Sequence, residues 1–223
     1  MEDRFFKKFL QVSNRVANEG LRETWPIPNT ANKGRGDLGL LPEDQCIAAW
    51  QVPLSSAQLL RFLVLLQRPK IVLELGASLG FSTLWLALGA KEVGSHVYTT
   101  EIFSAKAALA RKNFSDAGVA DLITLYENDI LKVLEDWNED IPLDFVFMDA
   151  DKQRYGSYFD LIFPLMSDGA LLVVDNVGNY PQYMTDFLTK VNAIKDSASH
   201  QIGIDNGLLL FTKHNGTNLK QWV

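Results

Sequence analysis

Residues 71–83 read IVLELGASLGFST. Residues 71–75 form a short, mainly apolar run, which is typical of a strand buried on both faces of a sheet. Gly76 ends this run, and an apolar segment with helical spacing opens at Ser82. A buried strand that turns through glycines into a helix indicates the first unit of a parallel α/β fold.

The alternation of strand and helix continues along the rest of the chain. Further strands are expected at residues 96–101, 122–126, 143–148, 170–174, 202–204 and 208–211. Helices are expected at about residues 3–18, 57–67, 82–88, 105–117, 130–137, 153–166 and 183–194. This pattern predicts a parallel sheet covered by helices on both faces. Asp205, Asn206 and Gly207 predict a hairpin turn that adds an antiparallel strand at one edge.

The N-terminal part of the chain is organised differently. Residues 21–45 are rich in proline and glycine and have few periodic apolar positions, which predicts irregular structure. We therefore expect an N-terminal helix and irregular cap segment in residues 1–54, and a single compact domain in residues 55–223. The 223 residues are 47% apolar and 22% charged, which excludes disordered, collagen-like and disulfide-scaffold proteins.

Charge and cysteine content limit the expected binding partners and cellular compartment of the protein. The 21 basic and 27 acidic residues give a formal charge of −6, which argues against a general nucleic-acid binder. The single cysteine, Cys46, fits a reducing cytosol. The charged N-terminus lacks the apolar core of a signal peptide, and no apolar run approaches the roughly 20 residues that cross a bilayer. We expect a cytoplasmic protein with no membrane partner.

The turn after residues 71–75 is a candidate ligand site. Glycines let the backbone approach a ligand closely, and the free N–H groups of the following helix suit a carboxylate or a phosphate. Ser78 and Phe81 stand where the dinucleotide pattern G-x-G-x-x-G, begun at Gly76, needs Gly and then Gly or Ala. This spacing disfavours a dehydrogenase, and a plain strand-to-helix turn stays as the alternative.

Acidic side chains follow the next two strands. Glu101 lies 25 residues beyond Gly76, where a carboxylate can accept hydrogen bonds from both ribose hydroxyls of a nucleoside ligand. A solvated surface residue is the alternative. Asn128 and Asp129 follow the third strand, where a side chain can meet an adenine amino group, although a helix N-cap explains Asp129 equally well.

Oxygen-bearing side chains end the two strands after those. Asp149 follows residues 143–148, and Asp175 and Asn176 follow residues 170–174. If these strands are neighbours, about 4.8 Å apart, the three side chains converge on one point. Such an all-oxygen set suits Mg²⁺, Mn²⁺ or Ca²⁺ rather than zinc. The alternative is that they are strand-end residues facing water.

Lys152 lies three residues beyond Asp149, at the start of the next expected helix. A lysine there opposes the helix dipole, and a residue that breaks a local preference is a candidate functional residue. A solvent-exposed lysine, paired with Asp151, is the alternative.

In this order, these motifs resemble the cation-dependent O-methyltransferases that use S-adenosylmethionine. This family includes catechol O-methyltransferase, the plant caffeoyl-CoA enzymes and small bacterial homologues. The resemblance covers roughly residues 50–213, and its most specific parts are VLELGASLGFST, FMDADKQRYGSYF, LLVVDN and IDNGLLLFTK.

The resemblance implies a Rossmann-like class I methyltransferase fold. Its seven-stranded sheet is mostly parallel, has an antiparallel last strand and carries helices on both faces. S-adenosylmethionine is the implied cofactor. The residues implied to bind it are Trp50 and Val52, which close over the methionine moiety; Glu74, Gly76 and Ser82, at the amino-acid end; Glu101, at the ribose; Ile102 and Asp129, at the adenine; and Asp149.

The same resemblance implies metal-assisted chemistry. Asp149, Asp175 and Asn176 match the three protein ligands of a divalent cation, with Mg²⁺ expected first and Ca²⁺ or Mn²⁺ as alternatives. Lys152 matches the catalytic base, and Asp149 shares the catalytic centre with it. The implied reaction transfers a methyl group to a hydroxyl of a small acceptor, expected to be an aromatic vicinal diol. A homodimer is implied as well.

The chain departs from the family after Asn176. Many members continue there with Leu-Trp and a long polar loop that walls the acceptor pocket, whereas residues 177–181 read VGNYP here. Residues 21–45, which include Trp25, are the expected substitute for this wall. The tail, residues 213–223, is expected to pack on its own domain, with a dimer contact or a lid as the alternatives.

Two other functions compete with this reading. A tRNA hydroxyuridine O-methyltransferase is the alternative within the same chemistry, and the charge of −6 argues against it. A non-catalytic binding protein is the other, and the presence of Asp149, Lys152, Asp175 and Asn176 argues against that one.

Overall fold

The computed structural model describes residues 2–20, 51–138 and 140–214. The expected irregular segment 21–45, Trp50 and residues 215–223 of the tail lie outside the described residues. The predictions for the acceptor wall, for Trp50 and for the tail therefore stay predictions.

Among the described residues, seven strands form one sheet in the order β3-β2-β1-β4-β5-β7-β6. They are β1 (Ile71–Leu75), β2 (His96–Thr100), β3 (Ile123–Tyr126), β4 (Leu143–Met148), β5 (Met166–Asp175), β6 (Ala198–Ile202) and β7 (Leu208–Thr212). Among these strands, β7 runs antiparallel to both of its neighbours, β5 and β6, and every other neighbouring pair is parallel. The expected mostly parallel sheet with an antiparallel last strand is confirmed.

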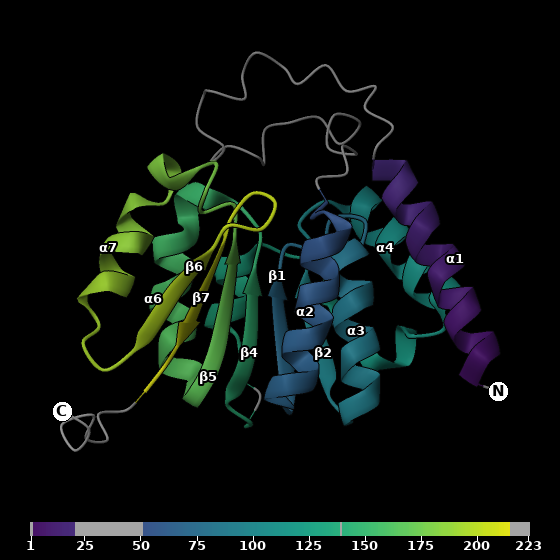
Figure 1. Cartoon of the computed structure of the whole chain (residues 1–223), viewed down its shortest axis with the longest axis horizontal. Coiled ribbons are helices and arrows are strands. Elements are labelled where there is room, and N and C mark those ends of the chain that lie inside the picture. The colour runs from purple at the N-terminus through teal and green to yellow at the C-terminus, as the bar shows by residue number, and fades with distance from the viewer. Residues whose placement is uncertain (1, 21–50, 139, 215–223) are drawn as a thin grey trace, which may run out of the picture.

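Helices cover both faces of this sheet (Figure 1). One side carries α1 (Glu2–Gly20), α2 (Leu54–Gln67), α3 (Phe81–Val93) and α4 (Ser104–Ala117), with α1 packed outside α3 and α4. The other side carries α5 (Ile130–Glu135), α6 (Tyr155–Leu165) and α7 (Thr185–Ala193). Three single 3₁₀ turns complete the described elements: η4 (Ala120–Leu122), η5 (Lys152–Arg154) and η6 (Pro181–Tyr183).

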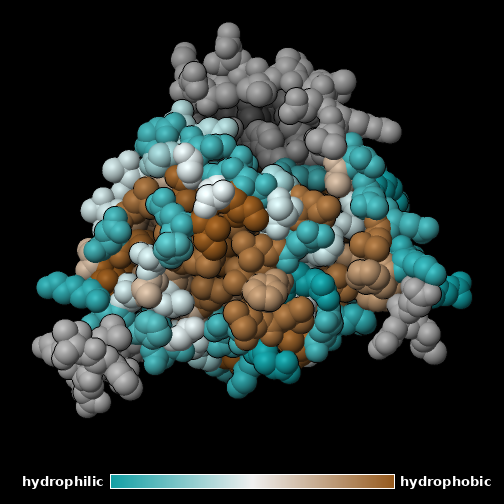
Figure 2. All heavy atoms as spheres, in the orientation of Figure 1, coloured by the Kyte–Doolittle hydropathy of each residue, from teal (hydrophilic) through white to brown (hydrophobic). Residues whose placement is uncertain are grey.

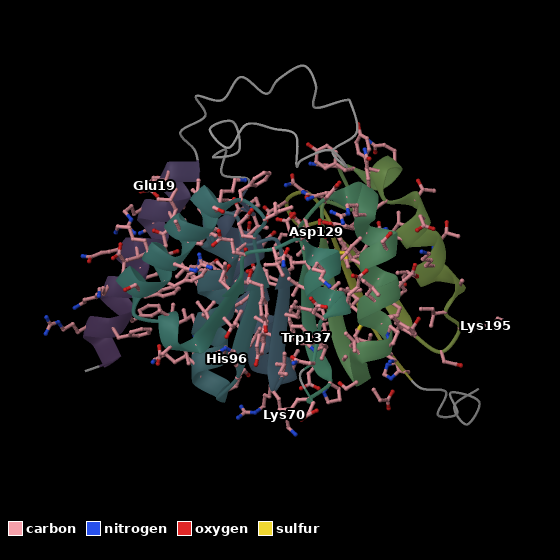
Figure 3. The ribbon with its side chains drawn as sticks, turned by 180° about the vertical axis from the view of Figure 1, so that it is seen from behind. Glu19, Lys70, His96, Asp129, Trp137 and Lys195 are labelled. Carbon is pink, nitrogen blue, oxygen red and sulfur yellow. The ribbon has the colours of Figure 1, made fainter. Side chains whose placement is uncertain are left out.

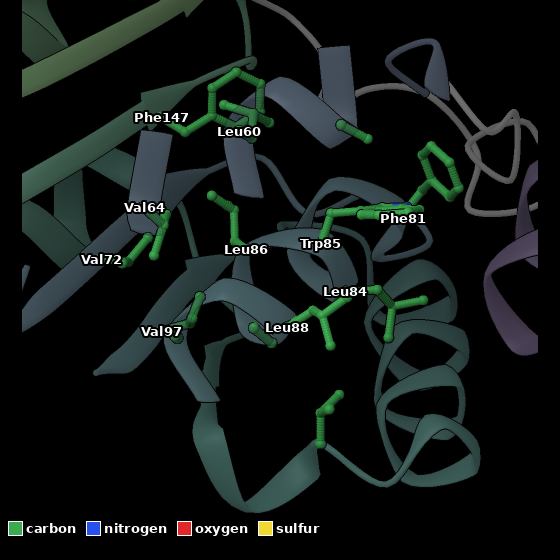
Figure 4. Packing of buried hydrophobic residues seen from close by; sticks show 14 of the residues in the cluster. Leu60, Val64, Val72, Phe81, Leu84, Trp85, Leu86, Leu88, Val97 and Phe147 are labelled. Carbon is green, nitrogen blue, oxygen red and sulfur yellow. The ribbon is translucent and has the colours of Figure 1, made fainter. Parts of the chain in front are cut away.

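Apolar side chains of α2 and α3 fill the space over the sheet (Figure 4). Trp85 of α3 lies edge-on to the ring of Phe9 in α1, with centroids 5.6 Å apart. Its indole N–H donates to Ser13 Oγ over 3.1 Å, which satisfies the polar atom of a nearly buried side chain. The N-terminal helix is therefore anchored in the main core.

One predicted strand is displaced. We expected residues 202–204, whereas β6 is Ala198–Ile202 and pairs only with β7 among the described strands. Its first four residues are exposed, so the sequence carries no apolar alternation there, and backbone pairing to β7 defines the strand. Smaller shifts move element ends by a few residues, since α5 stops at Glu135 and β5 starts at Met166.

Part of the surface over α2 is apolar (Figure 2). Phe62 and Leu66 on the outer side of this helix are 57% and 70% exposed. Within the described ranges, however, no helix combines the length and the apolar character that a bilayer crossing requires.

The strand order reverses direction at β1, which has β2 on one side and β4 on the other. Ligands of open α/β sheets bind at such a switch point, beyond the carboxyl ends of the strands. Leu75 pairs with Met148, and Met148 pairs with Val174, so the residues that follow β1, β4 and β5 emerge side by side. Asp129 lies at the same end of the sheet, and Lys70 lies at the opposite end (Figure 3).

Candidate active site

The turn after β1 approaches β4 closely. Gly76 has φ of +101°, and a Cβ built on it would lie 2.5 Å from the carbonyl oxygen of Asp149. Gly80 has φ of +85°, and its Cβ would meet the ring of Phe114 at 2.4 Å. Both positions therefore require glycine, for conformation and for space. The tight turn leaves the N-terminus of α3 facing the switch point.

Glu74 lies beneath this turn and is fully buried. Its carboxylate accepts hydrogen bonds from Ser82 Oγ at 2.6 Å, from Thr99 Oγ1 at 2.6 Å, and from Thr83 Oγ1. Burial raises the pKa of Glu74 to about 7, although the three hydroxyl donors oppose the shift and the Asp149 charge adds to it. The structure thus brings Glu74 and Ser82 together as a brace under the turn, and their contact with a cofactor stays a prediction.

Glu101 follows β2 and is only 7% exposed. Its two oxygens accept the backbone N–H groups of Ser78, at 2.8 Å, and of Phe103, at 2.9 Å. Burial raises the pKa of Glu101, while the nearby Lys106 charge and these N–H donors oppose the rise. The next residue, Ile102, is 41% exposed beside it. An anchored carboxylate with a neighbouring apolar side chain suits a nucleoside.

Asp129 caps a helix, which is one of the two roles that its sequence position allowed. It is the N-cap of α5, and its Oδ1 accepts the Leu131 N–H at 2.8 Å. It also accepts two hydrogen bonds from the Arg154 guanidinium, which holds the pKa of Asp129 below its usual range. Arg154 was not predicted as a site residue, because a partner 25 residues from Asp129 leaves no periodic signal in the sequence.

Lys152 pairs with Asp149 rather than with Asp151. Its Nζ lies 2.7 Å from Asp149 Oδ1, and the two side chains are only 12% and 16% exposed. Asp151 instead accepts the backbone N–H of Gln153 at 3.2 Å and caps η5. The predicted base and one predicted cation ligand therefore share a hydrogen bond.

Asp175 ends the neighbouring strand β5 and is 2% exposed. Its Oδ1 is buried and has no hydrogen-bond partner among the described residues. Burial and the Asp149 charge raise the pKa of Asp175 to about 7. Asn176 follows in the left-handed region, with φ of +68°, and is 8% exposed.

An unpartnered carboxylate oxygen beside a second carboxylate is what a hard divalent cation would neutralise, so these residues fit such a group. The set is two carboxylates and one amide. Across residues 2–20, 51–138 and 140–214, no group of three or more His, Cys, Asp and Glu side chains could hold a metal.

Val52 precedes α2 and is 4% exposed. Its neighbour Gln51 donates from Nε2 to the Val16 carbonyl in α1 at 2.9 Å. The segment before α2 is thus tied to the N-terminal helix.

Comparison with known proteins identifies the family that this chain resembles. Residues 41–194 match the family model described as O-methyltransferase. The catechol O-methyltransferase of Mycobacterium tuberculosis is 37% identical over 153 residues, which cover 63% of this chain and 69% of that protein. Caffeoyl-CoA O-methyltransferase 1 of Eucalyptus globulus is 29% identical over 163 residues, covering 64% and 66%.

The fold is also shared with solved structures. The O-methyltransferase from Bacillus cereus in complex with SAH superposes with a TM-score of 0.69 at 24% identity, and the match covers 90% of this chain and 99% of that one. With most of the domain matched by the family model, and with the M. tuberculosis enzyme more than one-third identical to it, the chain belongs to the O-methyltransferase family.

Proposed function

We propose that the protein transfers the methyl group of S-adenosylmethionine to a hydroxyl of a small aromatic vicinal diol, with the assistance of a divalent cation. Membership of the O-methyltransferase family supports the reaction class. The Bacillus cereus structure in complex with SAH supports the cofactor, and the catechol O-methyltransferase of M. tuberculosis supports the acceptor.

The observation that carries the proposal is the meeting of Asp149, Lys152 and Asp175 beside Gly76. Asp149 and Lys152 contact each other, and the Asp175 carboxyl is buried within reach of the Asp149 charge. Two carboxylates and a lysine at the ends of adjacent strands, next to a glycine turn, form a centre for both cation binding and proton transfer.

In this proposal Asp149, Asp175 and Asn176 would hold the cation. Bound there, a divalent cation supplies Lewis-acid chemistry, which lowers the pKa of the acceptor hydroxyls. The burial of Asp175 keeps water from its carboxylate and so strengthens its interaction with positive charge.

The chain's own residues perform the remaining tasks. Lys152 Nζ would take up the proton of the reacting hydroxyl from its neutral amine form, after the ammonium has released its own proton. It is suited to this role by its place at the strand end beside Asp149, mostly shielded from water. Glu101 orients the cofactor by its ribose hydroxyls, and the exposed Ile102 packs on the adenine. The Glu74 brace fixes the turn, so that the reacting groups meet with little loss of freedom.

A transfer assay tests the proposal directly. The protein is incubated with S-adenosylmethionine carrying a labelled methyl group and a panel of catechols, with Mg²⁺ or with EDTA. We expect labelled product with Mg²⁺ and its loss with EDTA. Equal transfer in EDTA would refute the cation, and absence of catechol product from a protein that binds S-adenosylhomocysteine (SAH) would refute the acceptor class. A parallel arm with unmodified and hydroxylated tRNA tests the alternative acceptor.

A further inference from the structure

Asp205 lies at the tip of the hairpin between β6 and β7, in the left-handed region with φ of +49°. Its carboxylate accepts Ser55 Oγ at 2.7 and 2.6 Å, Ser56 Oγ at 2.6 Å and the Ser56 backbone N–H at 3.1 Å. These serines belong to the first turn of α2, which is 149 and 150 residues away in sequence. One side chain therefore joins two distant elements.

The contact supplies what α2 lacks. Pro53 occupies the N-cap position without a side-chain hydrogen bond, and the first turn of α2, which the structure describes in full, holds no acidic residue. A carboxylate that accepts free N–H groups stabilises a helix N-terminus, and here it comes from the hairpin. Ser56 is fully buried, so the contact fixes the start of α2 and with it the preceding Val52.

The same hairpin turn holds the segment that follows Asn176. The Val177 N–H donates to the Gly207 carbonyl at 3.1 Å, and the Gly178 N–H donates to the Asn206 carbonyl at 3.0 Å. Gly178 and Gly207 are so close that a Cβ on Gly207 would lie 2.6 Å from the Gly178 nitrogen. Backbone contacts therefore secure this side of the turn, whereas the Asp205 side chain secures the α2 side.

We propose that Asp205 is a positioning residue that aligns residues 51–53, which include the predicted cofactor-binding residue Val52, with the proposed cation-binding strand end of β5. The inference rests on the proposed function for the roles of the two segments. Removal of the Asp205 carboxylate releases the start of α2 and leaves residues 177–179 attached through the backbone. The consequence is selective: cofactor binding weakens, while acceptor binding does not.

The variants are D205A, D205N and the double variant S55A/S56A, with D196A as the matched control. Asp196 precedes β6 and Asp205 follows it, so both single substitutions to alanine remove one acidic side chain at an end of the same strand. We expect D205A to raise the KM for S-adenosylmethionine and the Kd for SAH by about tenfold. Asparagine keeps one acceptor oxygen, so D205N should lie between D205A and the unchanged chain.

The split between kinetic constants separates positioning from general damage. Positioning changes the KM for the cofactor and leaves the KM for the acceptor within about twofold, whereas partial unfolding lowers the active fraction and changes neither KM. S55A/S56A should reproduce most of the D205A effect. Adding D205A to it should produce only a small further loss, because the double variant keeps the bond from the Ser56 backbone N–H. D205A with the SAH affinity of D196A would overturn the proposal.

Hydrogen exchange keeps the test independent of the reaction. In D205A, amides of residues 51–57 should exchange faster and those of residues 177–180 should not change. Were the unchanged chain to bind no SAH, the proposed cofactor would fail, and exchange alone would decide the role of Asp205. Faster exchange confined to residues 51–57 supports the role, and unchanged exchange there overturns it.

Discussion

Arg154 donates two parallel hydrogen bonds to Asp129, 2.7 Å from Nη1 to Oδ2 and 2.9 Å from Nη2 to Oδ1. Asp129 starts α5 at the proposed adenine edge, and Arg154 lies two residues after the proposed base Lys152. The pair therefore ties the segment that carries the base to the segment that meets the cofactor. Bidentate geometry fixes both direction and distance, which a single-point lysine contact does not.

Replacing Arg154 should loosen both segments. Because each side chain of the pair is about a third exposed, solvent screening limits its contribution to the free energy of unfolding to about 1 kcal/mol. We expect R154A to lower both SAH affinity and kcat several-fold, and R154K to lower them less. Calorimetry and steady-state kinetics measure these effects. The control is K190A, which breaks the ion pairs of Lys190 with Asp160 in α6 and with Asp186 in α7. An R154A protein with the affinity and rate of K190A would contradict the coupling.

Lys152 provides a sharper test of chemistry. Loss of a general base costs about 10²- to 10⁴-fold in rate, so K152A should lose kcat by that factor. K152R should be equally slow, because arginine keeps the positive charge but does not give up its proton. SAH affinity, measured by calorimetry, should stay within about twofold in both variants, and K132A on α5 serves as the exposed-lysine control. Full activity in K152R would remove Lys152 as the base.

Glu101 is expected to carry part of the cofactor affinity. Removing a charged hydrogen-bonding partner costs about 1–3 kcal/mol of binding free energy, so E101A should weaken SAH binding by about one to two orders of magnitude. E101Q keeps the size and one acceptor oxygen and should lose less. Titration calorimetry reports both values, and affinity unchanged in E101A would take Glu101 out of the site.

Gly76 and Gly94 form a matched pair for the glycine turn. Both have positive φ, +101° and +78°, but a Cβ on Gly94 meets nothing within 4 Å, whereas on Gly76 it meets the Asp149 carbonyl at 2.5 Å. G94A should lose about 1 kcal/mol of unfolding free energy from backbone strain alone. G76A should lose clearly more and should also weaken SAH binding, because the turn must move away from β4. Equal urea midpoints for the two variants would show that the close approach is unimportant.

The strands β1, β4 and β5 were predictable, because each contains a mainly apolar run that ends at a polar residue or a glycine. The bounds of β1 and β4 coincide with the predicted residues 71–75 and 143–148. The proximity of Asp149 to Asp175 depended on whether β4 and β5 are neighbours, which only the topology established. A mostly exposed edge strand such as β6 has no comparable sequence pattern, and its predicted position, residues 202–204, was wrong.

Long-range polar contacts were the other feature that could not be predicted from the sequence. The turn at Asp205 was expected from its residue types, but its use as the cap of α2 depends on tertiary structure. Likewise, the N-cap role of Asp129 has a local signal, whereas its pairing with Arg154 has none. Local chemistry predicts which side chains cluster at strand ends, and packing decides which of them bind one another.

Glu74 should make stability depend on pH. Its pKa is raised from 4.5 to about 7, so the folded state holds the proton of Glu74 more tightly than the unfolded state does. This contributes stability that is fully present below about pH 4.5 and is lost as pH rises through about 7. At about 1.4 kcal/mol per pKa unit, this amounts to about 3 kcal/mol of unfolding free energy. Urea unfolding between about pH 4.5 and 8 should show a smaller decline in E74Q than in the unchanged chain, and E135Q, on α5, should behave like the latter. If E74Q and the unchanged chain declined equally, the buried carboxylate would have to remain ionised throughout, held so by its three hydroxyl donors.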